Sequence, residues 1–211
     1  MSLFSRLARI FALAIAICVP AVGQKLPSAD AIAASGGFNG QLYSNGSLGF
    51  NMLAPGGWSF YTADQNSALV ARNRENAALS GDATLKTAAA NTQVLFQAMP
   101  PSVAGRETNA LFSCGVERLT KSLTAEKYIE ANKGLVLRRP GVKVTKDIHS
   151  IKLGSVNFSA FDVEGSTGKG VYRQRYIATV RKNAALFFVI TLYDDKQDAI
   201  VEHSLRSIKF R

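Results

Sequence analysis

The sequence predicts an α+β domain in which an antiparallel β-sheet is flanked by helices. Two observations favour this class. In the C-terminal third, four strand-like segments follow one another with only short turns between them, which is typical of a β-meander. Helical segments precede and follow that run instead of alternating with the strands, as they would in a βαβ fold. A chain of 211 residues, 47% of them hydrophobic, is also long enough to bury the core of one domain.

The N-terminal residues have the order of a secretory signal peptide. Arg6 and Arg9 precede an uncharged apolar run over residues 10–19, and Pro20 ends that run ahead of small residues. The run is about half as long as the roughly 20 residues that a membrane-spanning helix needs. We therefore expect residues 1–23 to be a cleaved signal peptide and the protein to be exported, to the periplasm or the extracellular space.

Two alternatives concern the same segment. An uncleaved helix would tether the protein to the membrane, and Cys18 would be the acceptor in a lipoprotein. The residue before a lipidated cysteine is normally small, and Ile17 is not, which disfavours the second alternative. Loss of Cys18 with the signal leaves Cys114 as the last cysteine, so we expect no internal disulfide and a buried thiol at Cys114.

The mature chain begins with a stretch of low complexity. Residues 24–40 are rich in Ala, Ser and Gly and have no sustained hydrophobic period, so they are predicted to be a flexible linker. Residues 41–211 are predicted to form the single α+β domain.

The first half of this domain is predicted to contain a hairpin followed by two helices. Residues 41–52 form the hairpin, with an Asn-Gly pair at Asn45 suited to a tight turn. The helices cover residues 64–81 and 82–90, and each has an aspartate at its start as a candidate N-cap.

Strands and helices then lead to the C-terminal meander. Residues 92–99 and 109–119 are predicted strands, and Thr124 caps a helix that ends between Gly134 and Arg139. The four strands of the meander are predicted at Val142–Lys152, Val156–Glu164, Val171–Val180 and Ala184–Tyr193.

The last of these strands is apolar on both faces. A strand of this kind lies at the centre of a sheet that is covered from both sides. A final helix is predicted over Asp195–Arg206, where Asp194 and Asp195 stand at the strand–helix junction and fit an N-cap.

Two segments resemble the PsbP-like superfamily. Residues Tyr43–Trp58 (YSNGSLGFNMLAPGGW) are similar to its first strand and the Pro-Gly-Trp corner that follows, and Leu205–Phe210 is similar to its ending. The resemblance implies a PsbP-like sandwich, an antiparallel sheet between helices, over roughly residues 41–211. Members of that superfamily act mainly as non-enzymatic binding or assembly factors. The resemblance therefore implies a binding role and supplies no catalytic residues.

The charge of the chain favours acidic partners. The formal net charge is +10, and residues 138–182 contain ten basic residues against three acidic ones. A basic surface attracts acidic lipids, polyanions or acidic proteins. Nucleic acid is not an expected partner, because the chain is predicted to be exported and has no nucleic-acid-binding motif.

Three arginines are the candidate binding residues. On a strand, Arg173, Arg175 and Arg181 share one face, because their spacings are even. With a six-residue loop over residues 165–170, Asp162 would face Arg173, whereas Arg175 and Arg181 would have no acid opposite. Those two would then centre an anion site, unless the pairs are ordinary cross-strand stabilisation.

The chain offers little for catalysis. His149 and His203 are far apart in sequence and have no clustered carboxylates or thiols, so no metal site is predicted. The glycine-rich segment at 165–170 lacks the hydroxyl residue after Lys169 that a P-loop requires, and no cofactor is predicted.

The sequence thus predicts an exported, non-catalytic binding or scaffolding domain at the bacterial cell envelope, with an envelope protein or acidic ligand as partner. It predicts membrane contact only through the N-terminal segment, if that segment is kept. The alternative is an envelope enzyme that uses a cleft between sheet and helices, with His149 or Cys114 as the reactive group.

Overall fold

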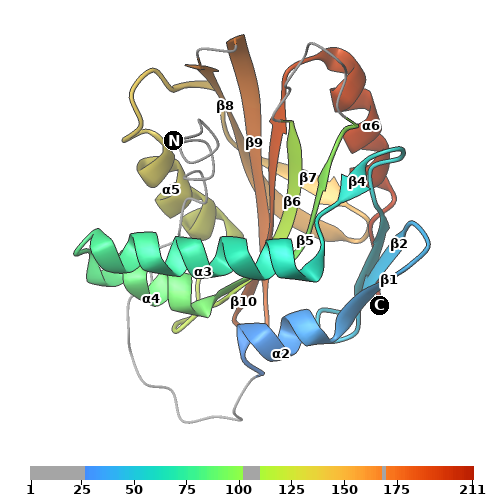
Figure 1. Ribbon diagram of the computed structural model, residues 1–211, viewed down its shortest axis with the longest axis horizontal. Coiled ribbons are helices and arrows are strands. Elements are labelled where there is room, and N and C mark those ends of the chain that lie inside the picture. Colours follow the sequence, from blue (N-terminus) through green and yellow to red (C-terminus); the bar gives the residue numbers. More distant parts are fainter. Residues whose placement is uncertain (1–26, 102–109, 168–169) are drawn as a thin grey trace.

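Two antiparallel β-sheets form the framework of the fold (Figure 1). The computed structural model describes residues 27–101, 110–167 and 170–211, so the predicted signal peptide lies outside the described residues. The smaller sheet has the order β1-β2-β3-β11. Its strands are β1 (Gly36–Asn39), β2 (Leu42–Asn45), β3 (Phe50–Leu53) and β11 (Lys209–Phe210).

The larger sheet has the order β4-β5-β6-β10-β9-β8-β7. Its strands are β4 (Ser59–Phe60), β5 (Thr92–Met99), β6 (Leu111–Arg118), β7 (Lys143–Leu153), β8 (Val156–Thr167), β9 (Gly170–Arg181) and β10 (Ala184–Leu192). The predicted meander is confirmed as β7-β8-β9-β10, and the α+β class is confirmed with it. The sequence predicted one sheet, whereas the N-terminal hairpin pairs with β1 and the C-terminal strand to make a second one.

The central strand β10 is buried on both faces, as its apolar composition predicted. Leu186 and Phe188 point to a core that contains Met52 of the smaller sheet and Leu205 near the C-terminus. Phe187 points to the other face, into a second core. Because alternate residues of a strand face opposite sides, β10 supplies side chains to both cores.

The helices cover both faces of the larger sheet. Their bounds are α2 (Ala29–Ala34), α3 (Ala63–Leu79), α4 (Ala83–Asn91), α5 (Ala125–Val136) and α6 (Asp195–Arg206). Helix α5 packs against β8 and β9, α6 packs against β10 and β3, and α2 packs against β5 and β6. Helices α3 and α4 lie side by side, with α3 against β5 and α4 against β6 (Figure 1).

Most of the predicted caps are present. The side chains of Asp82, Thr124 and Asp194 accept hydrogen bonds from backbone N–H groups in the first turns of α4, α5 and α6. At α3 the cap is Thr62 rather than Asp64. Thr62 and Gln65 form a reciprocal capping box, which satisfies two N–H groups and moves the helix start ahead of the aspartate.

The range predicted as a linker contains regular structure in its second half. Residues 29–34 form α2 and residues 36–39 form β1. Ile32 is 4% exposed and packs with Val116 and Ala184 of the larger sheet. The segment has too few apolar residues to show a period, yet Ala29 and Ile32, one helical turn apart, bury the inner face of the short helix.

Replacing Phe188 tests how far the fold depends on β10. Phe188→Ala removes a fully buried ring that contacts Phe112 and Phe158, and we expect a loss of about 3–5 kcal/mol in the free energy of unfolding. Urea unfolding followed by circular dichroism measures it. The matched control is Leu79→Ala, because Leu79 is 79% exposed and its loss costs less than about 0.5 kcal/mol. Equal stability losses in both variants would contradict this account of the core.

Candidate functional site

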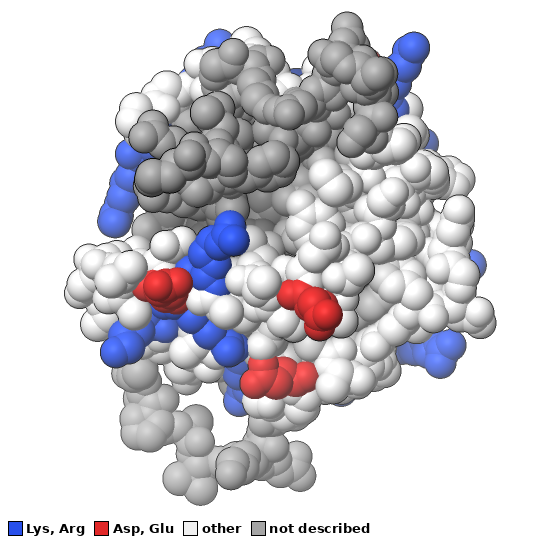
Figure 2. Space-filling view, viewed as in Figure 1, with Lys and Arg blue, Asp and Glu red and all other residues white. Residues whose placement is uncertain are grey.

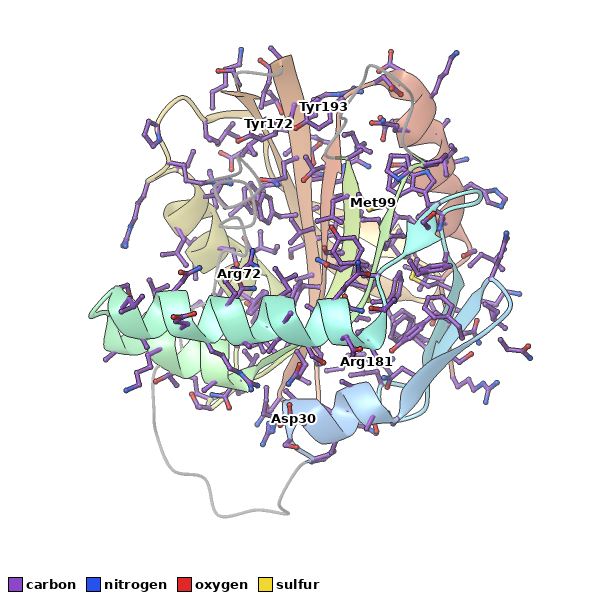
Figure 3. All side chains as sticks on the ribbon, in the orientation of Figure 1. Asp30, Arg72, Met99, Tyr172, Arg181 and Tyr193 are labelled. Carbon is purple, nitrogen blue, oxygen red and sulfur yellow. The ribbon has the colours of Figure 1, made fainter. Side chains whose placement is uncertain are left out.

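The three predicted arginines lie on one face of β9, as expected. Burial alternates along the strand, and Tyr172 and Tyr176 are buried on the opposite face, where Tyr176 joins the core beneath α5. Arg181 lies at the end of β9 nearer to α2, and Tyr172 lies at the opposite end (Figure 3). The arginines thus extend along β9, and Arg181 has different surroundings from the other two.

The hairpin before the arginines is tighter than predicted. Thr167 pairs directly with Gly170, so strands β8 and β9 continue through most of the range expected to be a six-residue loop. Gly165 is a strand residue, and a Cβ there would lie 2.4 Å from the hydroxyl oxygen of its cross-strand partner Tyr172. The glycine is needed because the tyrosine ring lies over the backbone. Strands flank the segment on both sides, so it has no helix N-terminus to bind phosphate.

In this register, the acidic neighbours of Arg173 and Arg175 differ from those that the sequence predicted. Asp162 lies opposite Arg175, not Arg173, and its carboxylate is 3.2 Å from Nε of Arg175. Arg175 also pairs with Glu202 of α6. Burial by itself lowers the pKa of the Arg175 guanidinium, but the two carboxylates outweigh it and raise that pKa.

Arg173 is paired in the same way. Its guanidinium is 2.8 Å from a carboxylate oxygen of Asp195 and 4.0 Å from one of Asp198. Asp195, Asp198 and Glu202 follow an i, i+3, i+7 spacing along one side of α6. Arg173 and Arg175 are therefore paired with carboxylates of α6 and β8, and the expectation that Arg175 has no acid opposite is wrong.

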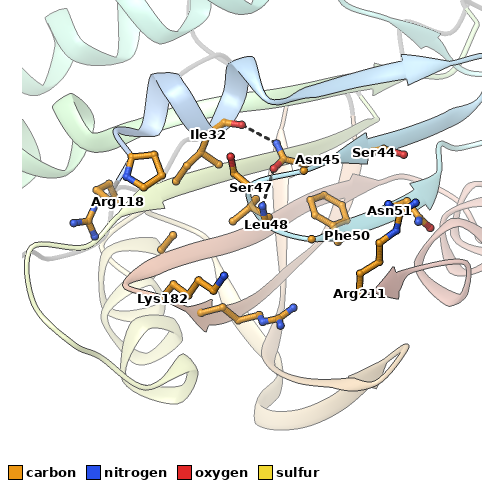
Figure 4. A pocket seen from close by; sticks show the side chains of 15 residues that line it. Ile32, Ser44, Asn45, Ser47, Leu48, Phe50, Asn51, Arg118, Lys182 and Arg211 are labelled. Atoms are coloured by element: carbon orange, nitrogen blue, oxygen red, sulfur yellow. Dashed lines mark hydrogen bonds between the residues drawn. The ribbon is translucent and has the colours of Figure 1, made fainter. Parts of the chain in front are cut away.

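Arg181 lies in different surroundings, at the edge of a basic pocket of about 370 Å³. The pocket lies where the turn between β2 and β3 meets the ends of β6, β9 and β11 (Figure 4). Among the residues that the structure describes, its lining includes four cationic side chains and no Asp or Glu. The cations are Arg118, Arg181, Lys182 and Arg211.

The register of the larger sheet places two of these cations on either side of a small residue. Ala184 at the start of β10 is opposite Arg118 of β6 and also opposite Arg181 of β9. Directly opposed residues share a face, so both arginines project on the side of Ala184, about 9–10 Å apart at the backbone. Ala184 and Ile32, which packs against it, both line the pocket.

The turn between β9 and β10 brings in the third cation. Lys182 and Asn183 link Arg181 to its partner Ala184 and have φ values of 48° and 55°, as in a two-residue hairpin turn of type I′. Lys182 is exposed at the tip of this turn. The backbone carbonyl of Asn183 accepts a hydrogen bond of 3.0 Å from Nη1 of Arg118, which ties the end of β6 to the turn.

The guanidinium of Arg181 packs against an aromatic ring. Its carbon lies 4.9 Å from the centroid of the Phe210 ring, a cation–π contact. Its Nη1 atom is buried and has no hydrogen-bond acceptor among the residues that the structure describes. A buried charged donor without a partner is costly, so an anion in the pocket would supply what the protein does not.

The opposite wall of the pocket is built around Asn45. Its buried amide donates to the carbonyl of Ile32 at 2.8 Å and accepts from the N–H of Leu48 at 2.9 Å, which ties α2 to the turn (Figure 4). Asn45 ends strand β2, and the turn spans Gly46 to Gly49, so the predicted two-residue turn at Asn45 is wrong. The positive φ of the turn falls at Gly49, at 65°. Asn45 serves as a hydrogen-bonding hub instead.

The basic residues do not gather on every side of the molecule. On the face shown in Figure 2, basic and acidic side chains are interspersed over α3, and much of the described surface is uncharged. This face of the molecule therefore carries no continuous basic surface.

The residues proposed for an enzyme do not converge. Cys114 lies on β6 and is fully buried, and that burial raises the pKa of its thiol well above the ordinary value. His149 lies on β7, with β10, β9 and β8 between the two strands, and its Nδ1 is 2.8 Å from the carbonyl of Asp147. Among the described residues no group of three His, Cys, Asp or Glu side chains is placed to hold a metal ion. Trp58 is a core residue.

The sequence matches no protein-family model and no curated protein. Solved structures similar to the chain include PsbP from the cyanobacterium Synechocystis sp. PCC 6803, with 13% identity, a TM-score of 0.48, and coverage of 83% of this chain and 98% of that one. They also include LpqN, a Mycobacterium tuberculosis protein involved in cell envelope biogenesis, with 12% identity, a TM-score of 0.46, and coverage of 54% and 70%. Both likenesses concern the fold alone.

Thiol reactivity tests the exclusion of Cys114 as a nucleophile. In a Cys18→Ser variant, which leaves one thiol, we expect iodoacetamide to modify Cys114 at least about a hundredfold more slowly in the native protein than in urea, because the buried thiol must wait for unfolding. Mass spectrometry at timed intervals measures the two rates. Modification of the folded protein at the rate of a free thiol would restore the enzyme alternative.

Proposed function

We propose that the protein is an exported, non-catalytic binding domain of the cell envelope, and that its binding site is the basic pocket. The ligand is an acidic group, as the basic composition of the chain predicted. Of the predicted arginines, Arg181 belongs to this site, whereas Arg173 and Arg175 hold α6 against the sheet.

One observation carries the proposal: four cationic side chains converge on a cavity, and no Asp or Glu of the described part of the chain lines it. Arg173 and Arg175, on the same strand, are each paired with carboxylates. At the pocket it leaves Nη1 of Arg181 buried without an acceptor. A volume of about 370 Å³ lies within the roughly 300–1,000 Å³ range of small-molecule sites, which suits a compact anionic group.

The location of the cations explains how an anion would be held. Arg118 and Arg181 are half-buried, whereas Lys182 and Arg211 are exposed. A guanidinium with free N–H donors binds phosphate or carboxylate oxygens directly and with defined geometry. The exposed cations raise the local potential and speed the approach of the ligand, at a cost in sensitivity to salt.

Export is supported by the order of the N-terminal residues: two arginines, a short apolar run, a proline and small residues up to residue 23. In the part of the chain that the structure describes, no helix is long and apolar enough to cross a membrane. Location in the periplasm or outside the cell is part of the same proposal.

Catalysis has no support of comparable weight. The enzyme alternative required a reactive Cys114 or His149 in a cleft, and Cys114 is enclosed in the core. His149 lies on the outermost strand of the larger sheet, away from the basic pocket, which it does not line. The buried Nη1 atom of Arg181, by contrast, needs only an acceptor to be satisfied.

Two arginine variants separate the pocket from the rest of the arginine row. With glycerol phosphate as the probe, Arg181→Gln is expected to weaken binding about ten- to a hundredfold, because it removes a charged hydrogen bond of about 1.5–3 kcal/mol. Isothermal titration calorimetry at constant ionic strength measures the dissociation constants.

The matched control is Arg173→Gln, which removes the same charge from the same strand. We expect its dissociation constant to stay within about twofold of the original, since Arg173 is already paired with Asp195. A larger loss of affinity in Arg173→Gln than in Arg181→Gln would indicate that the anion binds at Arg173 and not in the pocket. Absence of measurable binding in the unaltered protein would remove the proposed function.

A further inference from the structure

We propose that the basic pocket and the adjoining outer face of the smaller sheet dock on the surface of an anionic lipid bilayer, with a phosphate ester head group in the pocket. This inference rests on the proposed function and names its ligand. It goes beyond the membrane contact that the sequence predicted, which was confined to the N-terminal segment.

The outer face is the side of the smaller sheet that points away from the core. Its members alternate with the buried Tyr43, Phe50 and Met52 along strands β2, β3 and β11. We define the outer face by Leu42, Ser44, Asn51, Leu53 and Lys209.

This face is continuous with the pocket. Ser44 and Asn51 are opposite each other in the register, and both line the pocket. Leu42 and Leu53 form the next pair on the same side, about 7 Å further along the strands. One surface thus begins with cations at the pocket and ends with a pair of leucines.

The two leucines expose part of their apolar side chains to solvent. Leu42 is 38% exposed and Leu53 is 37% exposed, although each has a large apolar side chain. Single exposed leucines are ordinary, but a facing pair next to a cationic pocket has the composition of an interfacial membrane-binding surface. Such surfaces bury apolar side chains at the boundary between head groups and acyl chains while basic residues attract the anionic lipids.

Charge complementarity selects the occupant. Lys209 lies opposite Asn51 and is exposed, which adds a fifth cation to the four of the pocket. Within the described ranges of the chain, no Asp or Glu belongs to the outer face or to the pocket lining. An anionic bilayer offers many phosphate groups above an apolar layer, and so matches both halves of this surface at once.

The start of the described chain lies on the same side. Pro27 lines the pocket and is exposed, so the described part of the chain begins at the proposed head-group site.

Co-sedimentation with vesicles tests the inference, with the protein recovered after export. We expect binding to vesicles of phosphatidylcholine and phosphatidylglycerol, little binding to phosphatidylcholine alone, and weaker binding as the ionic strength rises, since the attraction between surface charges is screened. Arg181→Gln is expected to weaken vesicle binding at least about fivefold.

A leucine variant separates membrane docking from simple anion binding. Leu42→Ser/Leu53→Ser is expected to bind glycerol phosphate as the unaltered protein does, but to bind anionic vesicles at least about fivefold more weakly, because it loses the apolar contact. The control is Leu79→Ser on α3, which removes an even more exposed leucine from another part of the surface and should change neither affinity.

The possible failures are distinct. If glycerol phosphate binds but anionic vesicles bind no better than neutral ones, the ligand is a soluble anion, and the membrane inference is overturned while the proposed function stands. Equal vesicle binding by the leucine variant and the unaltered protein would also overturn it. If neither glycerol phosphate nor anionic vesicles bind, both the proposed function and the inference fail.

Discussion

Strand β10 determines the layout of the molecule, because it is apolar on both faces and must be covered twice. One cover is α5 with its own core, and the other is the smaller sheet together with α6. The second cover is assembled from residues near both ends of the described chain, since β11 pairs with β3. The smaller sheet meets the larger one at the ends of its central strands. There the turn after Asn45 faces the first residue of β10, and the pocket lies between the two sheets.

The same arrangement divides the basic residues of β9 into two groups. Helix α6 lies over the far part of the strand and presents carboxylates to Arg173 and Arg175, so these guanidinium groups bind protein. Arg181, at the other end, extends beyond α6 and meets the ring of Phe210 and a cavity. Arginines that look equivalent in the sequence therefore differ in what they have left to bind.

Helix caps and hydrophobic patterns predicted most helices and strands. They did not predict contacts between segments that are distant in the sequence. The bounds of α6, the cap at Asp194 and the central place of β10 follow from caps and from hydrophobic pattern, which act over a few residues. The acidic spacing along α6 was visible, but its pairing with Arg175 depends on where the helix docks. The pocket joins Arg118 and Arg211, which are far apart in sequence, and no local period reveals such a set.

The central claim is that an anion binds between the turn of the smaller sheet and the start of β10. Nuclear magnetic resonance of the backbone amides during a titration with glycerol phosphate tests it most directly, because the position of the shifts locates the ligand. We predict that the largest shifts fall on Gly49, Arg181 and Lys182, whereas the amide of Arg173 stays unchanged. Shifts centred on Arg173 and α6, with none at Lys182, would contradict the account.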